Sequence, residues 1–179
     1  VSQMGLDKGS RVTLVRQSDG TVLVMPENFK KAEKPTEATI EVAPKEESDL
    51  IIRKIVSAYL VGYNVIRLKA RDGRLDLNQR NAIKGFTRKN LVGTEIIADS
   101  PNEIMMKVLL SYPELSVESA LRRMCIITSS MHKDAMMALK GLDADLAREV
   151  IDMDDEVDRF SLYIIRQLKA AVEDPNILK

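Results

Sequence analysis

Two aspartates one helical turn apart are the residues of this sequence best placed to do chemistry. Asp154 and Asp158 lie in the run 151–158, Ile-Asp-Met-Asp-Asp-Glu-Val-Asp, within a stretch whose apolar residues recur at steps of four and three. On a helical wheel at about 100° per residue, the other acidic residues of the run fall opposite the apolar stripe, whereas these two fall at its border. Like charges there repel each other and lose hydration, so something must compensate them.

Three kinds of compensation are open. The aspartates could form ion pairs with a neighbouring helix, on which Arg122, Arg123 and Lys133 are candidates. They could bind a metal ion such as iron, zinc or another divalent cation, because carboxylates one turn apart in a helical bundle converge on a cation. One pair supplies too few ligands, so facing helices would have to add more. They could also act as a catalytic acid and base, although no nucleophile or second motif accompanies them.

The aspartates are expected to lie on the second helix of a helical hairpin. Ser116 is a good cap for a helix that continues to about Lys140, Gly141 breaks it, and Asp143 caps a second helix through residue 173. So short a connection makes the two helices antiparallel, and two helices alone leave one flank bare. We therefore expect a third helix, from another chain or from sequence beyond these residues. The predicted seam of the first helix is Val117, Leu121, Met124, Thr128, Met131, Ala135, Ala138 and Leu142.

Residues 48–110 predict a small sheet with helices on one face. The pattern gives helices at 48–61, ended by Gly62, and at 78–90, followed by Gly93 as a stop, with Ser48 as the cap of the first. Alternating strands are expected at 63–69, 94–98 and 103–110, and residues 38–43 form a candidate edge strand. Three basic residues step by four along the second helix, and this row is either a solvated face or a phosphate or nucleic-acid contact. They are Arg80, Lys84 and Arg88.

The N-terminal part predicts a β-hairpin, with strands at 11–15 and 21–25 and a turn that ends in Asp19-Gly20. We expect an α+β chain in four segments. These are a hairpin at 1–29, a linker at 30–36, a mixed α/β segment with an open sheet at 37–112, and an antiparallel pair of long helices at 113–179.

Composition narrows the classes of protein. The 27 basic and 27 acidic residues of the 179 balance, which argues against a strong whole-chain attraction to nucleic acid. A single cysteine, Cys125, favours a reducing, cytoplasmic setting, and we expect it to be a small buried residue. No apolar run approaches the length of a membrane span. With His132 as the only histidine, a histidine-rich metal site or a Ser-His-Asp triad has little to build on.

Three segments resemble parts of known regulators. Gly5-Leu-x-Lys-Gly-x-x-Val12 followed by Asp19-Gly20-x-Val22-x-Val24-x-Pro26 resembles part of a SpoVT/AbrB-type domain. The run from Tyr59-Leu-x-Gly-Tyr-Asn-x-Ile66 through Arg80 to Leu91-x-Gly-x-Glu-Ile-Ile97 is similar to the middle region of archaeal phosphate uptake regulators. Arg123-Met124, Met131, Asp134-Ala135 and Asp154-Asp-Glu-Val-Asp158 resemble the helical repeat of PhoU proteins.

The resemblance implies a function. PhoU-like proteins carry an E/D-x-x-x-D motif that binds metal on three-helix bundles, and Asp154 and Asp158 match its two ends. The implied protein is a non-enzymatic regulator of phosphate uptake that binds a transport or signalling protein and forms a homodimer or higher oligomer. The SpoVT/AbrB-type segment implies DNA binding in a dimeric barrel. A transcriptional regulator whose C-terminal part dimerises or senses a ligand is therefore the alternative.

Overall fold

The computed structural model describes residues 9, 11–16, 20–26, 37–109 and 115–173. The chain divides into two compact units, Val1–Lys34 and Pro35–Lys179. The predicted linker at 30–36 and most of the predicted turn before Gly20 lie outside the described residues. The four-segment division stays a prediction, although the second unit holds both the sheet and the long helices.

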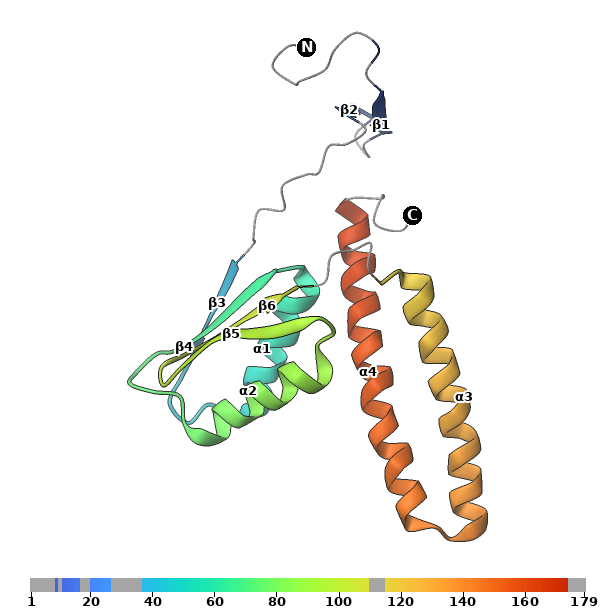
Figure 1. Ribbon diagram of the computed structural model, residues 1–179. Coiled ribbons are helices and arrows are strands. Elements are labelled where there is room, and N and C mark those ends of the chain that lie inside the picture. The colour runs from blue at the N-terminus through green and yellow to red at the C-terminus, as the bar shows by residue number, and fades with distance from the viewer. Residues whose placement is uncertain (1–8, 10, 17–19, 27–36, 110–114, 174–179) are drawn as a thin grey trace. The chain divides into compact units, whose positions relative to one another are not determined.

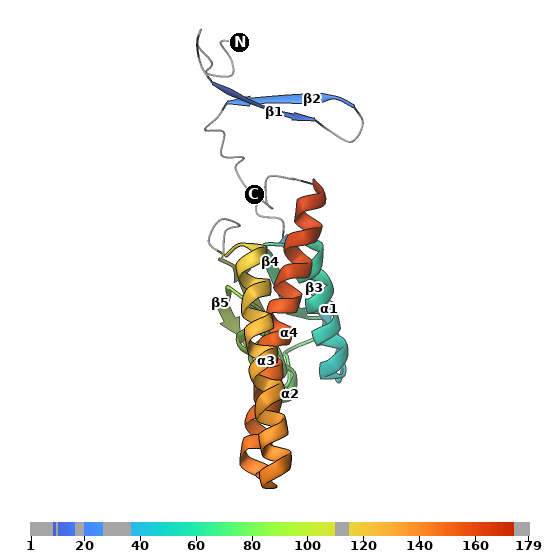
Figure 2. The same ribbon diagram turned by 90° about the vertical axis from the view of Figure 1, so that its right-hand side faces the viewer.

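The first unit contains the predicted hairpin. Strands β1 (Val12–Arg16) and β2 (Val22–Pro26) pair antiparallel, with Leu14 opposite Val24, and Figure 2 shows the two strands side by side. The alternation of a strand puts four apolar side chains on one face, and all four are exposed: Val12, Leu14, Val22 and Val24. A two-stranded hairpin with an exposed apolar face is marginal in water.

The second unit begins with the predicted open sheet. Its elements are β3 (Glu37–Val42), α1 (Ser48–Val61), β4 (Val65–Ala70), α2 (Leu77–Asn90), β5 (Thr94–Ser100) and β6 (Glu103–Val108). The strand order is β3-β4-β6-β5, with β3 parallel to β4 and the other pairs antiparallel. Figure 1 shows α1 and α2 on one face of this sheet. The core between the sheet and these helices includes Ile55, Ile66, Leu68, Ile83 and Ile104, all fully buried.

The caps of α1 and α2 differ in part from the prediction. Ser48 is the first residue of α1 rather than its cap, and the preceding Glu47 makes no capping bond through its side chain. Gly62 ends α1 as predicted, with a left-handed φ of 109° that favours glycine. Helix α2 is capped by Asp76, whose side chain accepts from the Gln79 backbone in a reciprocal capping box. It ends at Asn90, as predicted, and its C-cap is Leu91 rather than Gly93.

The basic row on α2 is largely a structural feature. Arg80 and Lys84 both form ion pairs with Asp99 on β5. The Lys84 hydrogen bond and the Arg80 guanidinium hold the pKa of Asp99 below its ordinary value. Two of the three basic residues therefore tie α2 to the edge strand β5, a role that neither of the two predictions for this row included.

Two long helices complete the second unit. Helices α3 (Val117–Gly141) and α4 (Ala144–Glu173) run antiparallel, α4 packs against α1 and α2, and α3 packs against α4 (Figures 1 and 2). The α+β class with a C-terminal helical pair is thereby confirmed. Among the described residues, no helix is both long enough and apolar enough to cross a membrane.

Candidate functional site

The helical pair that carries the two aspartates begins at the predicted cap, but its first helix ends later than predicted. Ser116 caps α3 by accepting from the Ser119 backbone N–H at 3.1 Å. Gly141, the predicted break, is the last residue of α3, and the C-cap is Leu142, which takes a left-handed φ of 53°. Asp143 then caps α4, since its Oδ1 accepts from the backbone N–H groups of Asp145 and Leu146, both at 3.0 Å. The turn is therefore closed by local hydrogen bonds.

The seam between α3 and α4 was only half predicted. Ala120 and Ala138 are buried, and Met124, Ile127 and Met131 are half-buried, so α3 turns this row toward α4. The prediction was right at Val117, Met124, Met131 and Ala138, and wrong at Leu121, Thr128, Ala135 and Leu142, which are exposed. Helix α3 carries two largely apolar rows side by side, and a single partner helix can cover only one of them.

A buried arginine anchors α4 to the sheet unit. Arg166 is only 3% exposed. It donates to the carbonyl oxygens of Tyr59, Gly62 and Tyr63 and to Asn64 Oδ1, and it lies over the Tyr59 ring at 4.8 Å from the centroid. Its positive charge thus meets the carbonyl end of α1, where the helix dipole is negative. Because of this contact, the position of α4 is tied to the end of α1.

Asp154 and Asp158 are both exposed. No ion pair or hydrogen bond to either carboxylate occurs in the described part of the chain. Two of the three predicted ion-pair partners are engaged elsewhere: Arg122 pairs with Glu118 at 3.3 Å and Arg123 with Glu156 at 3.8 Å. The third, Lys133, is exposed. The prediction that these arginines compensate Asp154 and Asp158 was therefore wrong. Solvent hydrates both carboxylates, so no internal cation is needed to hold them.

The neighbouring Asp155 is the carboxylate that makes a contact between elements. It forms an ion pair with Lys89 at the end of α2. The hydrogen bond and the charge of Asp155 raise the pKa of Lys89 above its ordinary value. This pair joins α4 to α2. The helical wheel correctly predicted that Asp155 lies away from the apolar stripe.

As ligands for a metal, Asp154 and Asp158 offer two hard oxygen donors on adjacent turns. Within the described residues, no group of three or more histidine, cysteine, aspartate or glutamate side chains is placed to hold a metal ion. A metal at this pair would therefore complete its coordination shell from water or from groups outside the described residues. The metal site at Asp154 and Asp158 stays a prediction.

Cys125 and His132 do not form a buried pair. Cys125 is exposed, contrary to the prediction that it would be a small buried residue, and His132 is exposed as well. Both belong to a row of α3 that α4 leaves uncovered. The signal that could have revealed this row is a second repeat with steps of four and three, displaced by one residue from the seam.

We call this uncovered surface the open face. It consists of one row on each helix, and both rows repeat at alternating steps of four and three, as in a helix-packing seam. Every member except the half-buried Ser161 is exposed. The α3 row is Leu121, Cys125, Thr128, His132, Ala135 and Leu139, and the α4 row is Ala147, Ile151, Asp154, Asp158, Ser161, Ile165, Leu168 and Val172.

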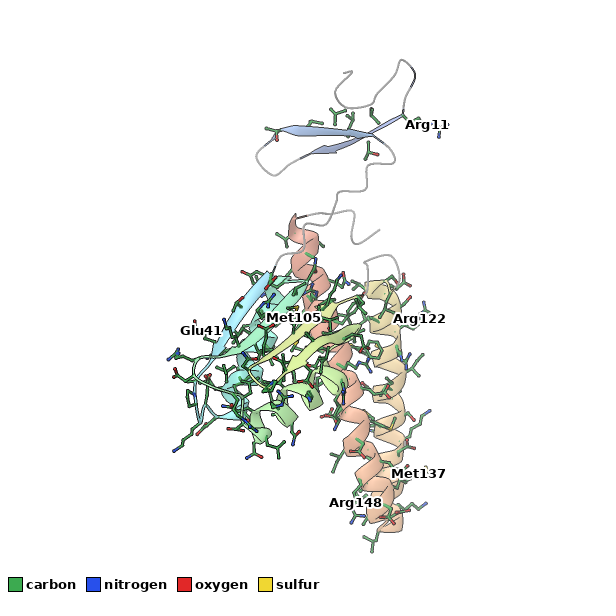
Figure 3. The ribbon with its side chains drawn as sticks, turned by 60° about the vertical axis from the view of Figure 1, so that its left-hand side comes forward. Arg11, Glu41, Met105, Arg122, Met137 and Arg148 are labelled. Atoms are coloured by element: carbon green, nitrogen blue, oxygen red, sulfur yellow. The ribbon has the colours of Figure 1, made fainter. Side chains whose placement is uncertain are left out.

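Helical geometry places the two rows on the same side of the pair. On each helix the row lies about 100° from the contact seam, in the same sense of rotation about the helix's own direction. Because the helices are antiparallel, equal rotations lead to one common flank. On the opposite flank Arg123 pairs with Glu156 at 3.8 Å and lies over the Phe160 ring at 5.1 Å, and both charged side chains are more than half exposed. Figure 3 shows Arg122 and Arg148 near opposite ends of the pair, and neither belongs to the open face.

These features define an antiparallel helical pair of the bundle type, with exposed side chains on both flanks. The family model described as PhoU domain matches residues 121–178, which include most of α3, all of α4 and both aspartates. This segment of the chain is therefore PhoU-like. The comparison with curated proteins gave no match, and neither did the comparison with solved structures. The resemblances of the earlier residues to SpoVT/AbrB-type domains and to archaeal regulators stay predictions.

Proposed function

We propose that the protein is a non-enzymatic, cytoplasmic regulator of phosphate uptake that acts by binding a transport or signalling protein. The PhoU domain match on α3 and α4 is the observation that carries this proposal. The structure adds support, because it places an exposed, largely apolar surface on the matched helices. Large uncovered apolar patches mark sites of protein interaction.

Deletion of the gene in its own cell tests the proposal. Phosphate uptake is expected to stay high in rich phosphate, because the regulator that restrains it is absent. Reintroducing the full chain should restore the response to external phosphate. Unchanged uptake in the deletion strain, at both low and high phosphate, would contradict the proposal.

A metal at Asp154 and Asp158 is a separate part of the proposal. We expect purified wild-type protein to contain iron, zinc or another divalent metal, and the Asp154→Ala, Asp158→Ala double variant to contain several-fold less. The physical reason is the loss of both oxygen ligands. Elemental analysis of the two proteins makes the measurement. A double variant of two other exposed α4 carboxylates, Glu149→Ala with Asp152→Ala, serves as control. Equal, near-zero metal in all three would refute the metal site.

The alternative is a DNA-binding transcriptional regulator, and the observation that favours it is the hairpin in the first unit. Its exposed apolar face on Leu14 and Val24 needs a cover, and pairing two copies into a barrel would supply one. A gel-shift titration at several salt concentrations separates the two functions. Binding that weakens steeply with salt favours the DNA-binding regulator, and no binding at low salt favours the protein-interaction function.

A further inference from the structure

The strand β3 at one edge of the four-stranded sheet presents open backbone groups. Among the described residues β3 pairs only with β4, and this parallel pairing runs along all six of its residues without a register shift. Val42 faces β4, because its carbonyl oxygen accepts from the Arg71 N–H at 2.9 Å. Backbone groups alternate in direction along a strand. The N–H and C=O groups of Thr39 and Glu41 therefore point to the edge away from β4, which we call the β3 edge.

The opposite edge strand is less suited to accept another strand. Strand β5 has a register shift near its middle, which marks a β-bulge. Its Asp99 is also held by Arg80 and Lys84 of α2. Bulges and charged side chains are common devices that keep an edge strand from pairing further. The regular β3 edge is therefore the better template for an added strand.

Helix α1 lines the β3 edge with apolar side chains. Lys54 of α1 donates to the Glu41 carbonyl oxygen at 3.4 Å, so this side of the helix lies beside the edge. Leu50 and Val61 lie on the same helical stripe as Lys54, and they are 48% and 65% exposed. On β3 itself, the half-buried Ile40 packs against the core beneath α1. The edge thus combines open backbone groups with an apolar border.

The outer face of β3 is acidic, and this charge decides between the possible occupants. Glu37 pairs with Arg67 at 2.6 Å, whereas Glu41 lies 3.5 Å from Arg71 and stays 65% exposed. A second copy paired through β3 would bring two more glutamates to the same face, and like charges on neighbouring strands destabilise a sheet. A partner strand with lysine or arginine on that face is attracted instead.

We propose that the β3 edge binds an extended segment of a partner protein, which pairs antiparallel with β3 and adds a strand to the sheet. The segment alternates apolar and basic residues. Its backbone would bond to Thr39 and Glu41, its apolar side chains would pack beside Leu50 and Val61, and its basic side chains would lie beside Glu41. Lys54 would give up the Glu41 oxygen and keep its ion pair with Glu46 at 2.5 Å. The site lies outside residues 121–178, the PhoU match, so it is separate from the surface of the proposed function.

Three short peptides test the proposal with the full chain. The first alternates lysine and valine, the second has glutamate in place of lysine, and the third is the lysine peptide with N-methyl groups on its lysine residues. Fluorescence anisotropy gives the three dissociation constants. The lysine peptide is expected to bind at least about fivefold more tightly than the glutamate peptide, because of the cross-strand charges. It should bind at least about tenfold more tightly than the methylated peptide, which lacks the N–H donors that face β3.

Two pairs of variants provide matched controls. Glu41→Lys should remove the preference for the lysine peptide, whereas Glu95→Lys makes the same change at an exposed position of β5 and should keep it. Thr39→Pro removes the N–H that points to the β3 edge, and Thr39→Val retains it. Proline is tolerated in an edge strand where its nitrogen faces away from the sheet, so only the proline variant should lose binding. Circular dichroism confirms that each variant is folded.

Amide hydrogen exchange reports on the edge without any substitution. In the chain alone, the Thr39 amide should exchange quickly and the Ile40 amide slowly, because only Ile40 faces β4; the lysine peptide should then slow Thr39. A Thr39 amide already protected without peptide would overturn the proposal, since another part of the chain would then cover the edge. Equal affinity for the lysine peptide and its methylated form would also overturn it. So would a concentration-dependent dimer that Thr39→Pro abolishes, because a second copy would then be the occupant.

Discussion

Replacing Arg166 with alanine is expected to lower the free energy of unfolding by about 3 kcal/mol or more. The guanidinium donates to three carbonyl oxygens at the end of α1 and to Asn64 Oδ1, and it is almost fully buried. Hydrogen bonds to a charged group contribute about 1.5–3 kcal/mol each, and the stacking contact with the Tyr59 ring is lost as well. Denaturant unfolding followed by circular dichroism makes the measurement.

Arg148→Ala is the matched control for Arg166→Ala. Arg148 also lies on α4 and forms an ion pair, with Asp145 at 2.6 Å, but both side chains are largely exposed. Exposed pairs contribute at most about 1 kcal/mol, so this variant should remain close to wild type. Equal losses for the two variants would show that the burial and hydrogen bonds of Arg166 contribute little.

The sequence predicted the architecture because its signals are local. The period of two in 63–69 and 103–110, the stop at Gly62 and the caps at Ser116 and Asp143 each act within a few residues, and the structure bears them out. The cap of α1 was missed for a related reason. Ser48 has the right side chain for a cap, but the helix starts one residue earlier than a capping serine requires, and Glu47 takes that place.

The candidate site depends on contacts that no local pattern encodes. Both rows of α3 have an apolar, helical repeat, so the sequence could not determine which row faces α4. The contact of Phe160 and Tyr163 with Ala120 selects the inner row and leaves Leu121 and Leu139 exposed. The sequence pattern could not predict the role of Arg166 either, because its acceptors include carbonyl oxygens more than a hundred residues away along the chain. Every residue has a backbone carbonyl, so the residue types do not show which carbonyls will accept a hydrogen bond.

Replacing Leu68 with alanine is expected to destabilise the second unit by about 3 kcal/mol. Leu68 lies on the interior strand β4 and is fully buried in the core beneath α1 and α2. A buried leucine truncated to alanine typically costs about 2–5 kcal/mol, because transfer energy is lost and a cavity remains. Leu77→Ala makes the same chemical change at a site that is 71% exposed, so it should cost well under 1 kcal/mol. Similar losses at the two positions would contradict the assigned core.

The same variant also reports whether the sheet and the helical pair unfold together. Leu162 on α4 packs against the core that contains Leu68, and Arg166 joins α4 to the end of α1. Loss of the sheet core therefore removes the support of α4, and we expect Leu68→Ala to shift one common transition for helix and sheet signals. Amide hydrogen exchange resolved along the chain provides the second measurement. Protection that stays unchanged in α4 while it falls in β4 would show that the helical pair is stable without the sheet.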